Sequence, residues 1–164
     1  MLMGGTWDEG AVRALLGAAP FGLRCDEGHM ASYRAAFTHD SHSNELMPGG
    51  RKRGDVPYER LEFVGDAVID LVVSDHLYRS PMDYDEGGMT EERKKYAGDE
   101  EMAERLERKG IDLFPLCVHS RGLEVSEKNR RVIAASVFEA IVGAAYFNEG
   151  YAKAREIVEG ALIR

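Results

Sequence analysis

Four acidic residues stand within one largely apolar stretch, YERLEFVGDAVID, at residues 58–70. Glu62, Asp66 and Asp70 are spaced four apart and Glu59 precedes Glu62 by three, so on a helix they share one face. Like charges at this spacing repel one another. Because Asp and Glu are rarely fully buried, the ordinary interpretation of such a stripe is a solvated outer face.

The apolar residues around these acids argue against a fully solvated face. They occupy most of the other helical positions: Leu61, Phe63, Val64, Ala67, Val68, Ile69, Leu71, Val72 and Val73. The polar face is therefore narrow, and we expect the carboxylates to lie at the edge of the core. A buried carboxylate must take up a proton or be neutralised by a cation, and the stretch itself offers only Arg60.

A second apolar stretch, VIAASVFEAIVGAAYF, also contains a single acid, Glu139. Ser136 lies one turn before it and Gly143 one turn after it, and such small residues permit close helix packing. If the two stretches form neighbouring helices, Glu62, Asp66 and Glu139 converge on one point. Three carboxylates are hard oxygen ligands that suit Mg²⁺ or Mn²⁺, with water completing the coordination shell.

The elements that must position these acids are helices, because no convincing strand alternation occurs along the chain. Capping residues and apolar spacing predict helices from a capping box at Thr6–Glu9 to about Pro20, from about Met30 towards His39, from Pro57 to about Tyr78, from a cap at Thr90 to a stop at Gly98, from Met102 to Gly110, from a cap at Ser126 to about Phe147, and over residues 151–163. We therefore expect an all-α fold in a single domain that spans residues 1–164.

Composition limits the class of protein. With 44% hydrophobic and 30% charged residues the chain is of ordinary globular type. No apolar run reaches the ~20 residues that cross a bilayer, and the first residues lack a secretory pattern, so we expect a cytoplasmic protein with no membrane partner. The net charge of −8 argues against a broadly basic surface for nucleic acid, so a polyanion must be held locally or through cations.

These motifs resemble a known family in their order along the chain. YERLEFVGDAVIDLVVSDHLY resembles the signature helix of ribonuclease III, with FTHDSHSNE before it, DEGGMTEERKK after it and RRVIAASVFEAIVGAAY near the end. The resemblance covers about residues 10–160 and implies a ribonuclease III endonuclease-domain fold, a helical homodimer, without a double-stranded-RNA-binding domain. It also implies that Phe63 fills a cavity in the partner subunit, the alternative being an ordinary core residue.

The resemblance further implies roles for the acids. Glu62, Asp66 and Glu139 match catalytic metal ligands, and Glu59 and Glu86 match acids that line the catalytic valley. By loop composition alone, Glu86 is equally well explained as a solvated turn residue. Family members use Mg²⁺, for which Mn²⁺ can substitute, to cut double-stranded RNA into products with 5′-phosphate and 3′-hydroxyl ends. Such a cation activates water and offsets charge on the phosphate.

Three positions in these motifs depart from the family pattern. Ser136 stands where the family usually has a metal-binding aspartate, Tyr58 replaces a usual asparagine, and Asp70 has no acidic counterpart. Serine is a neutral and weaker ligand, so we expect lower affinity for Mg²⁺, although a water can bridge the hydroxyl to the ion. Asp70 is expected to be structural or to lie just outside the metal site.

Two hypotheses of different class follow. The leading hypothesis is a homodimeric, Mg²⁺-dependent endoribonuclease acting on double-stranded RNA. The rival is a weakened or inactive ribonuclease III fold that serves as an RNA-binding or dimerisation module, and a hydrolase of small phosphate esters would not explain the FEA segment. RNA binding would be weak and salt-sensitive, through local basic patches at Arg51–Arg53, Arg93–Lys95 and Lys128–Arg131.

Overall fold

The computed structural model describes residues 6–42 and 58–164, and over these residues the fold is all-α, as predicted. The elements are α1 (Glu9–Gly17), α2 (Glu27–Ala36), α4 (Tyr58–Tyr78), α5 (Glu86–Ala97), α6 (Asp99–Arg108), the short 3-10 helix η1 (Phe114–Leu116), α7 (Glu127–Glu149), α8 (Tyr151–Val158) and the π-helical turn η2 (Glu159–Ile163). In these ranges β pairing is limited to one isolated bridge between Thr38 and Val118.

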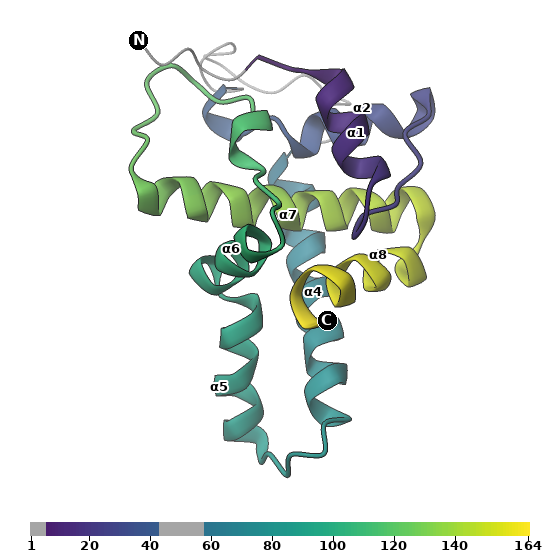
Figure 1. Ribbon diagram of the computed structural model, residues 1–164, viewed down its shortest axis with the longest axis vertical. Helices are drawn as coiled ribbons and strands as arrows, with labels where there is room; N and C mark the ends of the chain where they lie inside the picture. Colours follow the sequence, from purple (N-terminus) through teal and green to yellow (C-terminus); the bar gives the residue numbers. More distant parts are fainter. Residues whose placement is uncertain (1–5, 43–57) are drawn as a thin grey trace.

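Helix α7 forms the centre of the molecule. It runs across the domain with α1 and α2 on one side and α6 and α8 on the other, and it crosses α4 (Figure 1). The lower part of α4 and the antiparallel α5 project away from the rest of the fold (Figure 1). By length and composition α7 would suffice to cross a membrane, but most of it is buried inside the domain, which explains its apolar sequence on all sides.

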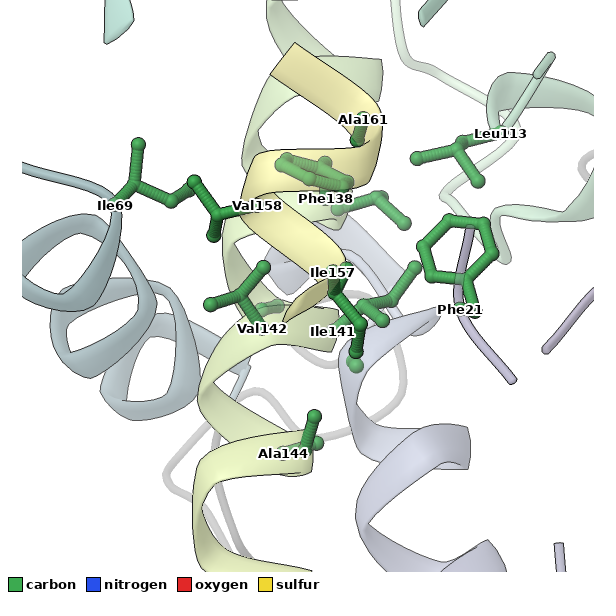
Figure 2. Close-up of a cluster of buried hydrophobic side chains, with 14 of the residues drawn as sticks. Phe21, Ile69, Leu113, Phe138, Ile141, Val142, Ala144, Ile157, Val158 and Ala161 are labelled. Carbon is green, nitrogen blue, oxygen red and sulfur yellow. The ribbon is translucent and has the colours of Figure 1, made fainter. Parts of the chain in front are cut away.

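The core is built where α7 meets α4 and α8. Figure 2 shows side chains that meet there: Ile69 of α4, Phe138, Ile141 and Val142 of α7, Ile157 and Val158 of α8, and Phe21 and Leu113 from connecting segments. The rings of Phe21 and Phe138 lie 6.2 Å apart between centroids. Each large apolar side chain buried in this way contributes ~1.5–3 kcal/mol, so the core fixes α7 firmly between its neighbours.

Helices α4 and α7 touch at their backbones. A Cβ atom added to Gly65 would lie 1.7 Å from the carbonyl oxygen of Glu139, and one added to Gly143 would lie 2.1 Å from that of Leu61. Neither distance is compatible with an atom, so each helix needs glycine opposite a carbonyl of the other. The predicted close packing of small residues is therefore found at this crossing.

Several helix starts were predicted at the wrong residue. The N-caps are aspartates whose carboxylates accept backbone N–H groups: Asp8 for α1, Asp26 for α2 and Asp85 for α5. The predicted starts at Thr6, Met30 and Thr90 were wrong, because a carboxylate cap also gains from the helix dipole and does not need apolar spacing immediately after it. Ser126 caps α7 as predicted. The predicted start at Pro57 and the patch Arg51–Arg53 lie outside the described residues.

Replacing Gly65 tests the backbone contact. The methyl group of Gly65→Ala would occupy the space of the Glu139 carbonyl, so α4 and α7 must separate. We expect the free energy of unfolding, measured by urea denaturation, to fall by about 3 kcal/mol. Gly17→Ala is the matched control, because an added Cβ there meets nothing within 4 Å, and it should leave stability equal or slightly higher. Equal losses in both variants would contradict the tight crossing.

Candidate metal site at the crossing of two helices

The three acids singled out by the sequence lie on the two helices that cross. Glu62 and Asp66 occupy successive turns of α4, on either side of the close contact made by Gly65, and Glu139 lies on α7 with its own carbonyl at that contact. Glu139 is only 7% exposed, Glu62 is half-buried and Asp66 is exposed. The carboxylates thus run from a buried floor at Glu139 to an open rim at Asp66.

Glu139 is the single buried charged side chain in the described part of the chain. No hydrogen bond or ion pair reaches its carboxylate from the described residues. Burial raises the pKa of Glu139 to about 8, and the charges of Asp66 and Glu62 add to the shift. A carboxyl group that keeps its proton to this pH for lack of a positive partner is a place where a bound cation would be strongly favoured.

The two acids of α4 are also disfavoured as anions. Burial raises the pKa of Glu62; the hydroxyl of Ser136 opposes this as a hydrogen-bond donor, whereas the charge of Glu59 reinforces it. Burial, followed by the charge of Asp70, raises the pKa of Asp66. The carboxylates therefore repel one another through space, as expected of groups that share one site without a positive ion.

Two charged residues near the site were not predicted there. Asp99, the first residue of α6, adds negative charge that raises the pKa of all three acids after burial has done so. The Arg93 guanidinium of α5 lies 3.8 Å from the Asp70 carboxylate and lowers the pKa of Asp66. The sequence indicated Asp99 only as a helix restart, because its proximity depends on how α6 packs against α7.

Glu86 does not join the cluster within its own chain. It is the first residue of α5, at the end of the projecting α4–α5 pair (Figure 1), and its carboxylate accepts a hydrogen bond from Thr90. Glu62 lies near the opposite end of α4, sixteen residues before Tyr78, which is about 24 Å along a helix. Glu59, by contrast, lies one turn before Glu62 and acts on its charge.

Phe63 is 77% exposed on α4. The alternative that it is an ordinary core residue was therefore wrong. An exposed aromatic side chain next to two acids of the cluster must be explained by an interaction outside the described chain, since burial of such a ring is strongly favourable.

The donor set fits a divalent cation in chemistry more than in preformed geometry. Within the described residues, no group of three or more His, Cys, Asp or Glu side chains is already arranged to hold a metal ion. Yet Glu62, Asp66 and Glu139 are all carboxylates, and they raise one another's pKa from two rigid helices. Carboxylates that repel one another stay apart until a positive charge offsets the repulsion, so a cation would have to draw them together.

Comparison with known proteins relates this arrangement to characterised chains. The family described as Ribonuclease-III-like matches residues 31–164. Ribonuclease 3 of Borreliella burgdorferi is 34% identical over 139 residues, which cover 84% of this chain and 54% of the relative. Ribonuclease 3 of Pelotomaculum thermopropionicum is 38% identical over 130 residues, which cover 79% and 50%. The chain thus spans about half the length of these curated relatives.

Solved structures show the same fold. One structure of the nuclease domain of ribonuclease III from Campylobacter jejuni matches with a TM-score of 0.65 and 23% identity, covering 94% of this chain and 98% of that one. A second structure of that domain matches with a TM-score of 0.63 and 24% identity, covering 93% and 95%. Given the family match over residues 31–164 and this shared fold, the chain belongs to the ribonuclease-III-like family.

Proposed function

We propose that this chain is a metal-dependent endoribonuclease domain that hydrolyses phosphodiester bonds of double-stranded RNA and leaves 5′-phosphate and 3′-hydroxyl ends. The observation that carries the proposal is Glu139, a buried carboxylate without a positive partner, placed against Glu62 and Asp66 in a chain of this family. Curated relatives carry the name Ribonuclease 3, which supports the same chemistry. We place the protein in the cytoplasm.

Glu62, Asp66 and Glu139 would hold Mg²⁺, with Mn²⁺ able to substitute. The bound ion would supply an activated water near neutral pH and positive charge against the phosphate. The chain's own part is to hold the three carboxylates at fixed positions. Glu139 is immobilised by the packed core around α7, and the glycine contact fixes its distance from the two acids of α4.

RNA binding by this domain must be weak without further contacts. Lys94 and Lys95 form ion pairs with Glu91 and Glu92 on the same helix, and Arg131 pairs with Glu107 at 3.2 Å. Two of the predicted basic patches are therefore largely neutralised by neighbouring acids. This supports recognition of the duplex by shape and backbone with a strong dependence on salt.

We infer that the domain forms a homodimer through α4. Phe63, Leu71 and Tyr78 are exposed apolar side chains along one side of this helix, which is an unusual stripe for a face that meets only water. In the Campylobacter jejuni nuclease domain, a flexible region is involved in dimer formation. Because Glu86 lies far along α4 from Glu62 in its own chain, its place in a catalytic valley would require the partner subunit.

The cleavage assay tests the nuclease directly. The purified chain with duplex RNA and Mg²⁺ or Mn²⁺ should release fragments with 5′-phosphate ends, and chelation by EDTA should stop the reaction. Glu139→Gln keeps the shape but removes the charge that would bind the ion, so the rate should fall by about 100-fold or more. Glu124→Gln, an exposed acid far along the sequence from α4, is the control and should cleave normally. Absence of cleavage with either metal would favour the binding-module alternative.

Stability of the metal-free protein should depend on pH through Glu139. Its pKa is about 8 in the folded state against an ordinary value near 4.5, so between these values the folded state binds more protons than the unfolded state. The melting temperature in EDTA should therefore fall as pH rises from about 5 to 8.

Millimolar Mg²⁺ should restore this loss at pH 8, because the ion replaces the proton as the compensating charge. Glu139→Gln should flatten the pH dependence and lose the response to Mg²⁺. Thermal melts at matched ionic strength measure both effects. An equal rise in melting temperature on adding Mg²⁺ to the wild type and to the variant would place the ion elsewhere.

The dimer is tested by Phe63→Ala. Since the side chain is exposed within one subunit, the variant should fold normally, while the dissociation constant of the dimer should rise roughly 30-fold or more. Sedimentation equilibrium measures the change. Phe147→Ala removes a comparably exposed ring from α7 and should leave the dimer intact. A wild-type chain that sediments as a monomer at all concentrations would rule out the proposed assembly.

A further inference from the structure

Tyr58 carries a buried phenol hydroxyl that lacks a hydrogen-bond partner. The residue begins α4 and is 5% exposed, and its Oη atom makes no hydrogen bond. In the described part of the chain this situation recurs only at Tyr33. A buried hydroxyl normally finds a partner, because leaving it unpaired costs free energy, so the surroundings of Tyr58 Oη call for an explanation.

The surroundings of Tyr58 belong to the acid cluster. Its ring packs against His39, with 5.5 Å between centroids, which fixes the direction of the side chain. Tyr58 and Glu62 are one turn apart on α4 and share a face. Burial, and after it the negative charge of Glu62, raises the pKa of the phenol, while Ser136 of α7 acts in the opposite direction as a hydroxyl neighbour.

Ser136 lies between the phenol and a proposed metal ligand. Its hydroxyl acts on the Glu62 carboxylate as a hydrogen-bond donor. A serine hydroxyl that donates to a carboxylate still has lone pairs with which it can accept. Ser136 and the Tyr58 phenol are neighbours but do not reach hydrogen-bond geometry, so this acceptor remains available to the buried phenol.

We propose that Tyr58 is a positioning residue of the nuclease site: its phenol donates to Ser136, whose hydroxyl donates to Glu62, and this chain turns the Glu62 carboxylate towards Asp66 and Glu139. The inference rests on the proposed metal-dependent function. The chain closes when Glu62 is held fully ionised, because a hydrogen bond to a charged acceptor is stronger than one to a neutral group. Two positions at which the sequence departs from the ribonuclease III pattern thus meet at one carboxylate.

Tyr58→Phe isolates the hydroxyl, since the ring and its packing against His39 are kept. Affinity for Mn²⁺, measured on the full chain by titration of the free-ion electron paramagnetic resonance signal, should fall about tenfold. The urea-denaturation stability of the metal-free variant should be unchanged or higher, because the change removes an unpaired buried hydroxyl. General damage to the fold would instead lower both quantities together, and that result would overturn the proposal.

Tyr33→Phe is the matched control. Tyr33 is also fully buried with an unpaired hydroxyl, but it lies on α2 beside Asn148 and Glu149. Its affinity for Mn²⁺ should equal that of the wild type. Ser136→Ala should weaken Mn²⁺ binding by a factor similar to Tyr58→Phe, and the double variant should be no weaker than the weaker single variant, because both changes break one chain.

The outcomes separate this inference from the proposed function. If the wild type binds Mn²⁺ and Glu139→Gln abolishes binding, the metal site stands. Equal affinity in the wild type and Tyr58→Phe would then overturn the role of Tyr58 alone. Additive losses in the double variant would also overturn it, since they would mean that Ser136 and Tyr58 act independently. If the wild type binds no Mn²⁺, the metal site and the role of Tyr58 both fail.

Discussion

The close contact between Gly65 and Gly143 is the constraint on which the site depends. Packed helices normally have axes 8–10 Å apart, with side chains between them. Here each glycine faces a carbonyl of the other helix at a distance that leaves no room for a methyl group. Glu139 therefore emerges directly beside the acids of α4. A larger residue at either position would hold the carboxylates apart, and their mutual effect would weaken with distance.

This arrangement concentrates negative charge, and the core must tolerate the cost. Burial and repulsion keep a proton on Glu139 up to a pH of about 8, which is the low-cost state of the site when nothing else supplies positive charge. A cation and that proton compete for the same carboxylate. Because α7 is packed on most sides, Glu139 cannot turn to solvent to escape the competition, so compensation has to come to it.

The sequence predicted the all-α fold and the shared location of Glu62, Asp66 and Glu139 on two crossing helices, because isolated acids in apolar helices leave few other arrangements. It did not place Asp99 or Arg93 near the site. Both depend on how α5 and α6 turn after the projecting hairpin, and residue spacing within one helix carries no information about that turn. Helix starts were misplaced for a local reason, since aspartate caps can precede the apolar pattern by several residues.

The charge of the site must suit a polyanionic substrate as well as a cation. Each further carboxylate would bind a metal ion more tightly but would also repel RNA phosphates, and basic residues such as Lys94 and Arg131 are already paired with acids. Neutral hydroxyls at Tyr58 and Ser136 avoid this conflict. They can orient Glu62 without adding negative charge, so the domain keeps a defined ligand geometry while limiting repulsion of the RNA backbone.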